Sequence, residues 1–333
     1  FGSSEGIAPP LFFMLCRALP RLAIRQGRHD PKWVKRLNVL LEFQRRPPVP
    51  EIPQTEEVQL KQPIEPHKPL LKSRRSGVLA YKMGCMSLWD EWGERHMVTV
   101  CKMDRCVVLE TRTLQKHGYE AVQVGMGYRG PHRHSHPQLA RFVKAGVAPK
   151  HHVAEFRVTS DCLLPEGHVF NVRHFVPGQW VFVSGWTKAK GYKGVMGRYN
   201  FSGQDATHGN RGGGKRRSHG AVSQGAAVSR IWKFTRMPGH VGPDPLVTNC
   251  KVFRTESTRN LLFLKGVVPG FKTGVLKISD ARGQTSLRNR HIRLPFPTFV
   301  PAEGVQYPVT MQQTPMERDP FLYPELPLYQ PDD

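Results

Sequence analysis

Short runs of apolar residues, many of them alternating with polar residues and interrupted by glycine, dominate the middle of the chain. They lie at Met97–Met103, Cys106–Leu109, Tyr119–Val124, Val153–Val158, Trp180–Trp186, Val247–Phe253, Leu261–Val268 and Gly274–Ile278. Short runs of this kind, bounded by turn residues, are typical of half-buried β-strands. The pattern predicts a mainly β fold with few helices, a small β-barrel whose folded body begins near Gly77.

Helical periodicity is confined to two short stretches. Apolar residues recur at helical spacing between Trp33 and Phe43, and a second short helix is expected at Gln138–Lys144, after Pro137. Proline marks the extended parts: Pro47–Pro69 contains seven prolines, and nine fall between Pro295 and the last residue. We expect the first segment to be a linker and the second to be an arm that lies over a protein surface.

These changes of composition predict a division of the chain into four parts. Residues 1–76 form a basic N-terminal arm with a short helix and a proline-rich linker. Residues 77–187 and 241–285 form the barrel body, with a small helical insertion near 131–152. Residues 188–240 form a basic internal extension, and residues 286–333 form a proline-rich, acidic C-terminal arm.

The charge balance favours a polyanionic partner. The 333 residues include 49 Lys and Arg against 26 Asp and Glu, a formal net charge of +23. Such a chain attracts nucleic acid, because each phosphate that a base neutralises releases condensed counterions. An anionic membrane surface is the second possibility, but no apolar run approaches the ~20 residues of a membrane span, so an integral membrane protein is excluded.

The extension, residues 188–240, carries most of the chemistry. It contains eleven Lys and Arg residues, eleven glycines and a single acid, Asp205, with almost no periodic apolar signal. It cannot bury enough apolar surface to offset the entropy of ordering it, so a partner is expected to order it. Aromatic residues such as Tyr192 and Trp232 lie among the bases, and aromatic rings stack on unpaired bases of RNA. For Tyr199 and Phe201, a small local core is the alternative.

No motif for a cofactor, a metal or catalysis is complete. Gly125–Gly130 has the spacing of a dinucleotide loop, but Pro131 and a histidine run follow it instead of an apolar helix. Gly209–Lys215 resembles a phosphate-binding loop, but Arg216 replaces the hydroxyl that would bind magnesium. The histidines at 132, 134, 136, 151 and 152 lack nearby Cys or carboxylate ligands at fixed spacing. The six scattered cysteines predict free, buried thiols in a reducing compartment.

A set of longer motifs occurs in order along the chain. They are Gly77–Met86, Gly118–Gly125, Phe175–Gln179, Thr187–Met196, Arg198–Phe201, Asp205–Asn210, Met237–Gly242 and Asn260–Gly270. With these motifs the chain resembles the universal large-subunit ribosomal proteins of the L-three family. The resemblance implies a β-barrel on the outer face of the large subunit and an extension that reaches through ribosomal RNA toward the peptidyl transferase centre. It also implies support of subunit assembly and no catalytic residues, since RNA forms the peptide bond.

Departures from the bacterial pattern point to the mitochondrial branch of that family. Bacterial relatives lack the basic N-terminal segment, the proline linker and the acidic tail, and their methylated glutamine aligns here with Ala226. We therefore expect a cleaved arginine-rich presequence and a place in the matrix, on the mitochondrial ribosome. The expected partners are large-subunit ribosomal RNA and, through the two arms, neighbouring ribosomal proteins. We expect no cofactor and no homo-oligomer.

The residues expected to bind RNA all lie in the extension. They are Lys188, Lys190, Lys193, Arg198, Tyr199, Asn200, His208, Asn210, Arg211, Lys215, Arg216, Arg217, His219, Arg230, Trp232, Lys233, Arg236 and His240. Two other functions remain open from the residues alone: an RNA-processing enzyme that uses the same basic finger, and a regulatory RNA-binding module that acts outside the ribosome.

Overall fold

The computed structural model describes residues 64–70, 72–203, 207–209, 222, 230–302 and 304–313. All of them belong to the second of the two units into which the chain divides, Ile52–Asp333. The helix expected between Trp33 and Phe43, the basic segment around it and most of the proline linker lie outside the described residues.

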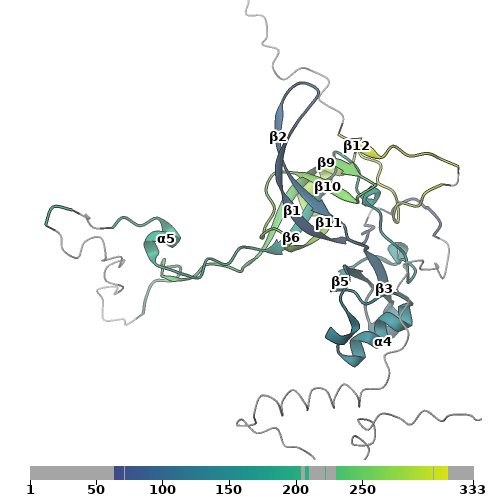
Figure 1. The fold of residues 1–333 in the computed structure, drawn as a ribbon, viewed down its shortest axis with the longest axis horizontal. Coiled ribbons are helices and arrows are strands. Elements are labelled where there is room, and N and C mark those ends of the chain that lie inside the picture. Colours follow the sequence, from purple (N-terminus) through teal and green to yellow (C-terminus); the bar gives the residue numbers. More distant parts are fainter. Residues whose placement is uncertain are drawn as a thin grey trace, which may run out of the picture. The chain divides into compact units, whose positions relative to one another are not determined.

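The described part of the chain is mainly β, as predicted, and its few helices are short (Figure 1). The strands are β1 (Val78–Trp89), β2 (Arg95–Lys102), β3 (Val107–Arg112), β4 (Ala121–Met126), β5 (His152–Arg157), β6 (Trp180–Trp186), β7 (Tyr192–Lys193), β8 (Gly239–His240), β9 (Pro245–Glu256), β10 (Leu261–Lys265), β11 (Val275–Asp280) and β12 (Thr310–Gln312). The helices are α3 (Leu114–His117), α4 (His136–Ala145) and α5 (Val195–Tyr199), and four 3₁₀ turns are η1 (Pro131–Arg133), η2 (Ser160–Cys162), η3 (Val172–His174) and η4 (Gly283–Asn289).

The larger sheet has the strand order β10-β2-β1-β11-β6-β9-β12, and all of its pairings are antiparallel. A further pairing joins β9 to β10. The strand β9 is long enough to pair with β6 from Pro245 to Lys251 and with β10 from Lys251 to Glu256. The hydrogen-bonded pairings therefore close a ring of six strands, and β12 adds to β9 outside this ring.

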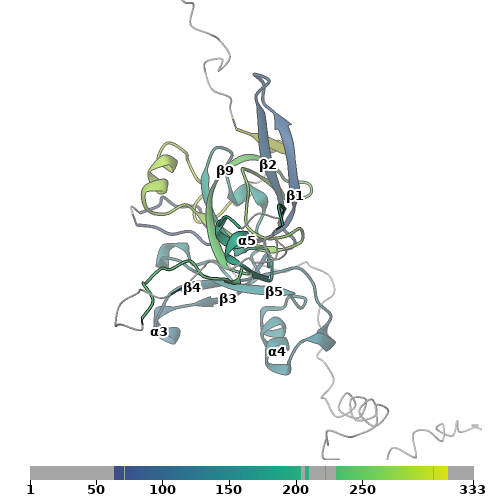
Figure 2. The ribbon, with the colours of Figure 1, turned by 90° about the vertical axis from the view of Figure 1, so that its left-hand side faces the viewer.

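A second, three-stranded sheet of order β3-β4-β5 forms apart from the larger one (Figure 2). One face of β4, with Val122, Val124 and Met126, joins the main apolar core. The helix α4 covers the opposite side of this sheet with Leu139 and Phe142, which pack against Leu109 of β3. A capping box begins α4, in which Ser135 and Gln138 bond each other's backbone groups, and Gly146 ends it in the left-handed conformation. The helix expected at Gln138–Lys144 is thus confirmed.

The main core explains why the predicted strands form. Alternate residues of β6 and β11, such as Val181, Val183, Leu276 and Ile278, are fully buried, while their neighbours along the strand are not. Burying apolar side chains contributes roughly 25 cal/mol per Å² removed from water, so a period of two fixes which face turns inward.

A buried polar cluster ties distant segments to this core. The guanidinium of Arg75 donates to both carboxylate oxygens of Asp280, from Nε at 2.8 Å and from Nη2 at 2.7 Å. It also donates to the Pro295 carbonyl, at 2.7 Å. The ring of His174 contacts the Thr298 hydroxyl at 3.0 Å and the Ser76 carbonyl at 3.1 Å. The segment before β1 and the segment after η4 are therefore fixed to the same point of the body.

One expectation about the cysteines is wrong. Cys101, Cys106, Cys162 and Cys250 are free and buried, as predicted, but Cys85 is free and exposed. Cys85 lies in the outer half of β1. This part of the strand pairs with β2 and extends past Tyr81, the last residue of β1 that pairs with β11.

Candidate nucleic-acid interface

Two segments leave the larger sheet side by side and carry the extension. They continue from the ends of the paired strands β6 and β9, and residues of β7 and β8 pair again further along, with Tyr192 opposite His240. Backbone hydrogen bonds join them in between, from Lys190 N to Val241 O at 2.8 Å and from Val241 N to Gly191 O at 3.0 Å. Figure 1 shows α5 beyond this pair of segments. These two segments, residues 187–193 and 239–245, form a two-stranded ribbon that we call the stem of the extension.

The two segments of the stem approach each other closely at Gly242. Its φ is +66°, and a Cβ built on it would lie 2.4 Å from the Lys188 carbonyl oxygen, which is backbone and cannot rotate away. Only glycine is suited to both the left-handed conformation and this approach. Asp244 stabilises the same place, because its side chain accepts a bond from Gly242 N at 3.2 Å while Thr187 Oγ1 accepts one from Asp244 N at 2.9 Å.

The helix α5 organises the bases and rings beyond the stem. It ends at Asn200, whose φ of 57° is left-handed and whose N–H bonds the Met196 carbonyl. Arg198 donates to the Met237 carbonyl at 3.0 Å and lies over the Tyr199 ring, 5.1 Å from its centroid. Arg236 from the returning chain lies over the same ring, at 5.8 Å. Tyr199 thus links both chains through cation–π contacts.

The other aromatic residues of the extension are not packed in a core. Tyr192 is 64% exposed, Trp232 is 73% exposed and Phe234 is 99% exposed. Tyr199 and Phe201 are only partly exposed, and their ring centroids lie 6.5 Å apart. Among the described residues, Tyr199 and Phe201 therefore contact each other only as a pair of partly exposed rings and form no larger core. Tyr192, Trp232 and Phe234 face solvent.

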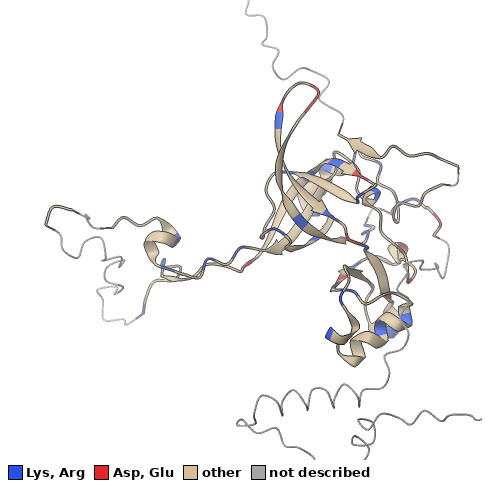
Figure 3. Ribbon diagram, viewed as in Figure 1, with Lys and Arg blue, Asp and Glu red and all other residues tan. Residues whose placement is uncertain are grey.

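The described bases of the extension have no acidic partner among the residues that the structure describes. Each of them is exposed, and no carboxylate of the described residues forms an ion pair with them. They are Lys188, Lys190, Lys193, Arg198, Arg230, Lys233 and Arg236. In Figure 3 the two chains of the stem carry several blue positions. Exposed cations without counter-charges, interleaved with exposed rings, are the combination that binds nucleic-acid backbone and unpaired bases.

The structure describes twelve of the eighteen residues expected to bind RNA. Besides the seven bases above, they are Tyr199, Asn200, His208, Trp232 and His240, and of the twelve only Tyr199 is partly buried. His240 packs edge-on against Tyr192, with ring centroids 5.7 Å apart. The other six, Asn210, Arg211, Lys215, Arg216, Arg217 and His219, lie outside the described residues.

The Gly125–Gly130 loop lacks the helix that a dinucleotide site needs. Only the 3₁₀ turn η1 follows it directly, and α4 begins later, at His136. Within the described part of the chain, no group of three or more His, Cys, Asp or Glu side chains is placed to hold a metal ion. None of the helices described there has the length and apolar character needed to cross a membrane.

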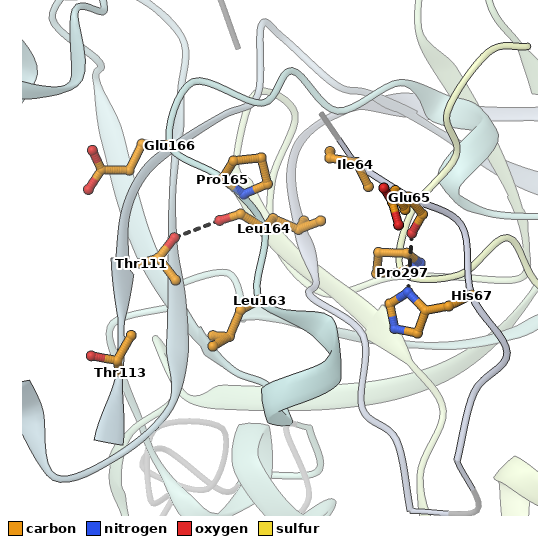
Figure 4. Close-up of a pocket in the computed structure, with 10 residues that line it drawn as sticks. All are labelled: Ile64, Glu65, His67, Thr111, Thr113, Leu163, Leu164, Pro165, Glu166 and Pro297. Atoms are coloured by element: carbon orange, nitrogen blue, oxygen red, sulfur yellow. Dashed lines mark hydrogen bonds between the residues drawn. The ribbon is translucent and has the colours of Figure 1, made fainter. Parts of the chain in front are cut away.

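A hollow of about 600 Å³ lies beside the end of the proline linker (Figure 4). Thr111 Oγ1 donates to the Leu164 carbonyl at 2.6 Å on one side of it, and His67 approaches the Glu65 carbonyl at 3.1 Å on the other. Among the described residues, its lining includes the carboxylates of Glu65 and Glu166 but no lysine or arginine. Its charge is therefore unsuited to an RNA phosphate.

Comparison with known proteins shows which family this chain belongs to. A family model described as "Ribosomal protein L3" matches residues 151–259, which include both chains of the stem. The "Large ribosomal subunit protein uL3m" of Arabidopsis thaliana is 38% identical to this chain over 233 residues, which is 70% of each protein. The chain belongs to the ribosomal protein L3 family. The resemblance seen in the sequence is thereby confirmed.

Membership of the L3 family makes this chain a ribosomal protein and not an enzyme, so the RNA-processing alternative is wrong. Its similarity to uL3m also confirms the expected mitochondrial ribosomal location.

Sequence reasoning missed several residues of this L3 protein that shape the interface. Gly242 and Asp244 hold the stem together, but nothing in their local sequence indicates which backbone they approach. It also missed the basic hollow beside α4, which brings together Arg129, Arg141 and Lys150. The available signal there is the density of histidines between residues 132 and 152, which by spacing alone suggests nothing beyond a metal site.

Proposed function

We propose that this protein is a structural constituent of the mitochondrial large ribosomal subunit, and that it binds large-subunit ribosomal RNA mainly through its extension. The relative uL3m is by name a large-subunit protein. The observation that carries the proposal is the stem, a paired ribbon that presents exposed bases and rings without acidic partners among the described residues. We further infer that the extension reaches toward the peptidyl transferase centre, supports assembly and buttresses that centre.

The proposed organisation follows the four parts predicted above. The ring of six strands supports a small barrel as the body, 77–187 with 241–285, which anchors the extension 188–240. The arms, 1–76 and 286–333, are proposed to contact neighbouring ribosomal proteins. The position of β12 on the edge of β9 supports this for the C-terminal arm, because this arm already uses strand pairing on the body.

Sedimentation of mitochondrial lysate on a sucrose gradient, with ultraviolet crosslinking in each fraction, tests this function. We expect the protein in the large-subunit fractions, with crosslinks from residues 188–240 to ribosomal RNA near the peptidyl transferase centre. Protein found mainly in light fractions and crosslinked to other transcripts would overturn the proposal in favour of a regulatory RNA-binding module.

A charge variant tests the stem directly. Lys190→Gln combined with Lys193→Gln removes two exposed cations from one chain of the stem. We expect weaker salt dependence when the purified protein binds a large-subunit ribosomal RNA fragment. The negative slope of log K against log salt should become shallower by about 0.7 to 0.9 for each phosphate that is no longer neutralised. Lys116→Gln, an exposed lysine on α3, is the matched control and should leave the slope nearly unchanged. An equal change in both variants would contradict the role of the stem.

The three adjacent bases Lys215, Arg216 and Arg217 lie outside the described residues, and their role is predicted from the sequence. Replacing all three by Glu should impair subunit assembly or translation, since the bases that would neutralise phosphates are removed and like charges repel. Normal subunit yield and normal translation would refute a role for these three bases.

A further inference from the structure

A basic hollow lies between α4 and the sheet β3-β4-β5, away from the extension in the sequence. We call it the insertion pocket. Its volume is about 340 Å³, and its lining includes three cations, Arg129, Arg141 and Lys150, and three histidines, His134, His151 and His152. None of the described residues that line it is an acid. Glu155, an acid on the neighbouring strand β5, is paired with Arg112 at 3.0 Å. Among the described residues neither Arg129 nor Arg141 forms an ion pair, so these two arginines make the pocket attractive to an anion.

Two buried polar atoms of the lining have no hydrogen-bond partner within the described part of the chain. Gln123 is only 8% exposed, and its Oε1 forms no hydrogen bond there. The same is true of the buried Nε2 of His134. An unsatisfied buried polar atom costs stability, and nearly all such atoms in folded proteins are bonded to something. Both residues line the insertion pocket, so a polar ligand in it is placed to satisfy them.

Hydrogen bonds within the protein hold the lining of the pocket in place without a ligand. Backbone bonds hold its loops, from Arg129 N to Pro149 O at 3.2 Å and from His151 N to Met126 O at 3.1 Å. Lys150 is 1% exposed, and its ammonium donates to the Arg105 carbonyl at 3.0 Å. Gly125 makes room for it, because a Cβ at Gly125 would lie 2.8 Å from Lys150 Cγ. A preorganised site loses less freedom on binding than a flexible one.

Two of the pocket's histidines, His134 and His152, supply hydrogen bonds more than charge. Burial is the main reason why the pKa values of His134 and His152 are lowered, and the neighbouring Arg129 and His151 lower them further. For His134, hydrogen bonds with the Gln138 side chain and the Arg129 backbone act in the opposite direction without reversing the shift. At neutral pH each ring is therefore uncharged and offers one donor and one acceptor. The positive charge of the pocket comes from its arginines and its lysine.

We propose that the insertion pocket binds one nucleotide of RNA, with its phosphate beside Arg129 and Arg141 and a ribose hydroxyl donating to Gln123 Oε1. A phosphate ion alone fills only a few water volumes of about 30 Å³ each, whereas the pocket lies within the ~300 to 1,000 Å³ range of small-molecule sites. A ribonucleotide brings both the anion that the arginines bind and the hydroxyl donor that Gln123 lacks. The identity of the ligand as RNA rests on the proposed function; the anion site itself rests on the pocket.

Photocrosslinking in the intact large subunit tests the site. Val153 lines the pocket and is exposed, so a benzophenone amino acid at this position reports what enters it. We expect crosslinks to a narrow stretch of ribosomal RNA. Arg141→Gln should reduce their yield at least fivefold, while Lys144→Gln, an exposed base on the same helix that does not line the pocket, should change it less than twofold. Crosslinks to protein only, or equal reductions in both variants, would overturn the proposal.

Thermal unfolding of the purified full chain separates a nucleotide from a bare phosphate. Gln123→Leu keeps a similar volume and removes the unpartnered oxygen, so it should raise the Tm of the free protein. The same variant should reduce the rise in Tm that uridine 5′-monophosphate produces in the native protein. If inorganic phosphate raises the Tm as much as the nucleotide, and equally in Gln123→Leu, the pocket binds phosphate alone and the assignment to RNA is wrong.

The two proposals fail separately. Lys190→Gln with Lys193→Gln weakens the binding of the extension and should leave the crosslinks from position 153 in place. When the same crosslinking is done in unfractionated mitochondrial lysate, crosslinks from position 153 mainly to RNA other than ribosomal RNA would refute the proposed function and retain the nucleotide pocket. Crosslinks from the extension alone would retain the function and refute the pocket.

Discussion

Replacing Gly242 by alanine should open the stem of the extension while the body stays folded. The added Cβ would lie 2.4 Å from the Lys188 carbonyl oxygen, whereas ordinary contact begins at about 3.4 Å, so one chain must shift by about 1 Å. That shift breaks the two backbone bonds between Lys190, Gly191 and Val241.

Two contributions set the loss of free energy that holds the stem closed in Gly242→Ala. A non-glycine residue in the left-handed conformation costs about 1 to 2 kcal/mol. Breaking two backbone hydrogen bonds costs about 1 to 3 kcal/mol more, at 0.5 to 1.5 kcal/mol each. Gly191→Ala is the matched control, because its φ is also positive, +68°, but nothing lies within 4 Å of its added Cβ. Gly194→Ala, with ordinary φ and open space, should be nearly neutral.

Amide hydrogen exchange at Lys190 and Val241 measures the opening. With 1.4 kcal/mol for each factor of ten, exchange in Gly242→Ala should be at least about fivefold faster than in Gly191→Ala, with the core strands β6 and β11 unchanged. Co-sedimentation with the large subunit should fall in the same order. Equal exchange in Gly242→Ala and Gly191→Ala would refute the close approach of Gly242 to Lys188 as the reason for glycine.

Three further predictions concern the body and the exposed rings. Burial is the main cause that lowers the pKa of His174 to about 3, below its ordinary 6.5. The unfolded chain therefore binds the proton first, so the free energy of unfolding falls as pH drops below 6.5, by about 2 kcal/mol at pH 5. Urea unfolding should show this loss, and an identical loss in His174→Gln would contradict it. Arg75→Met leaves Asp280 without its cation and should lower the unfolding free energy by about 3 kcal/mol, and adding Asp280→Asn should restore part of it in thermal unfolding. Trp232→Ala removes a ring that is 73% exposed, so the free energy of unfolding should change by less than about 0.5 kcal/mol. Stacking of this ring on a base predicts that the affinity for a ribosomal RNA fragment, measured by filter binding, weakens by about 1 to 3 kcal/mol. Unchanged binding would exclude stacking.

Eight strands and the α4 helix were readable from the sequence because they depend on local periodicity, but β1 (Val78–Trp89) was not among the predicted strands. Every predicted strand overlaps an observed one, and the expected helix at Gln138–Lys144 lies within α4. Capping signals at Ser135 and Gly146 are equally local. The sequence also predicts an extension over residues 188–240, since a segment with many bases and glycines and no apolar period cannot form a core of its own. That a partner orders this segment stays a prediction.

Pairing between distant strands was decided only by the tertiary structure. The closure of the ring needs β9 to meet both β6 and β10, and the stem needs residues near 190 to meet residues near 241. Local sequence sets which residues prefer extended backbone, but not which partner satisfies their hydrogen bonds.

Burial of polar side chains was likewise invisible in the sequence. Lys150 resembles any surface base, and Arg75 any base of a basic linker, yet both are buried and hydrogen-bonded to residues far along the chain. Cys85 was expected to be a buried thiol and is exposed. By itself the sequence determined the β character, the positive charge and the family of this protein, because composition, period and motif are local properties. The tertiary structure decided which of the described cations are exposed and which are buried, because burial and pairing depend on contacts between residues that are distant in the chain.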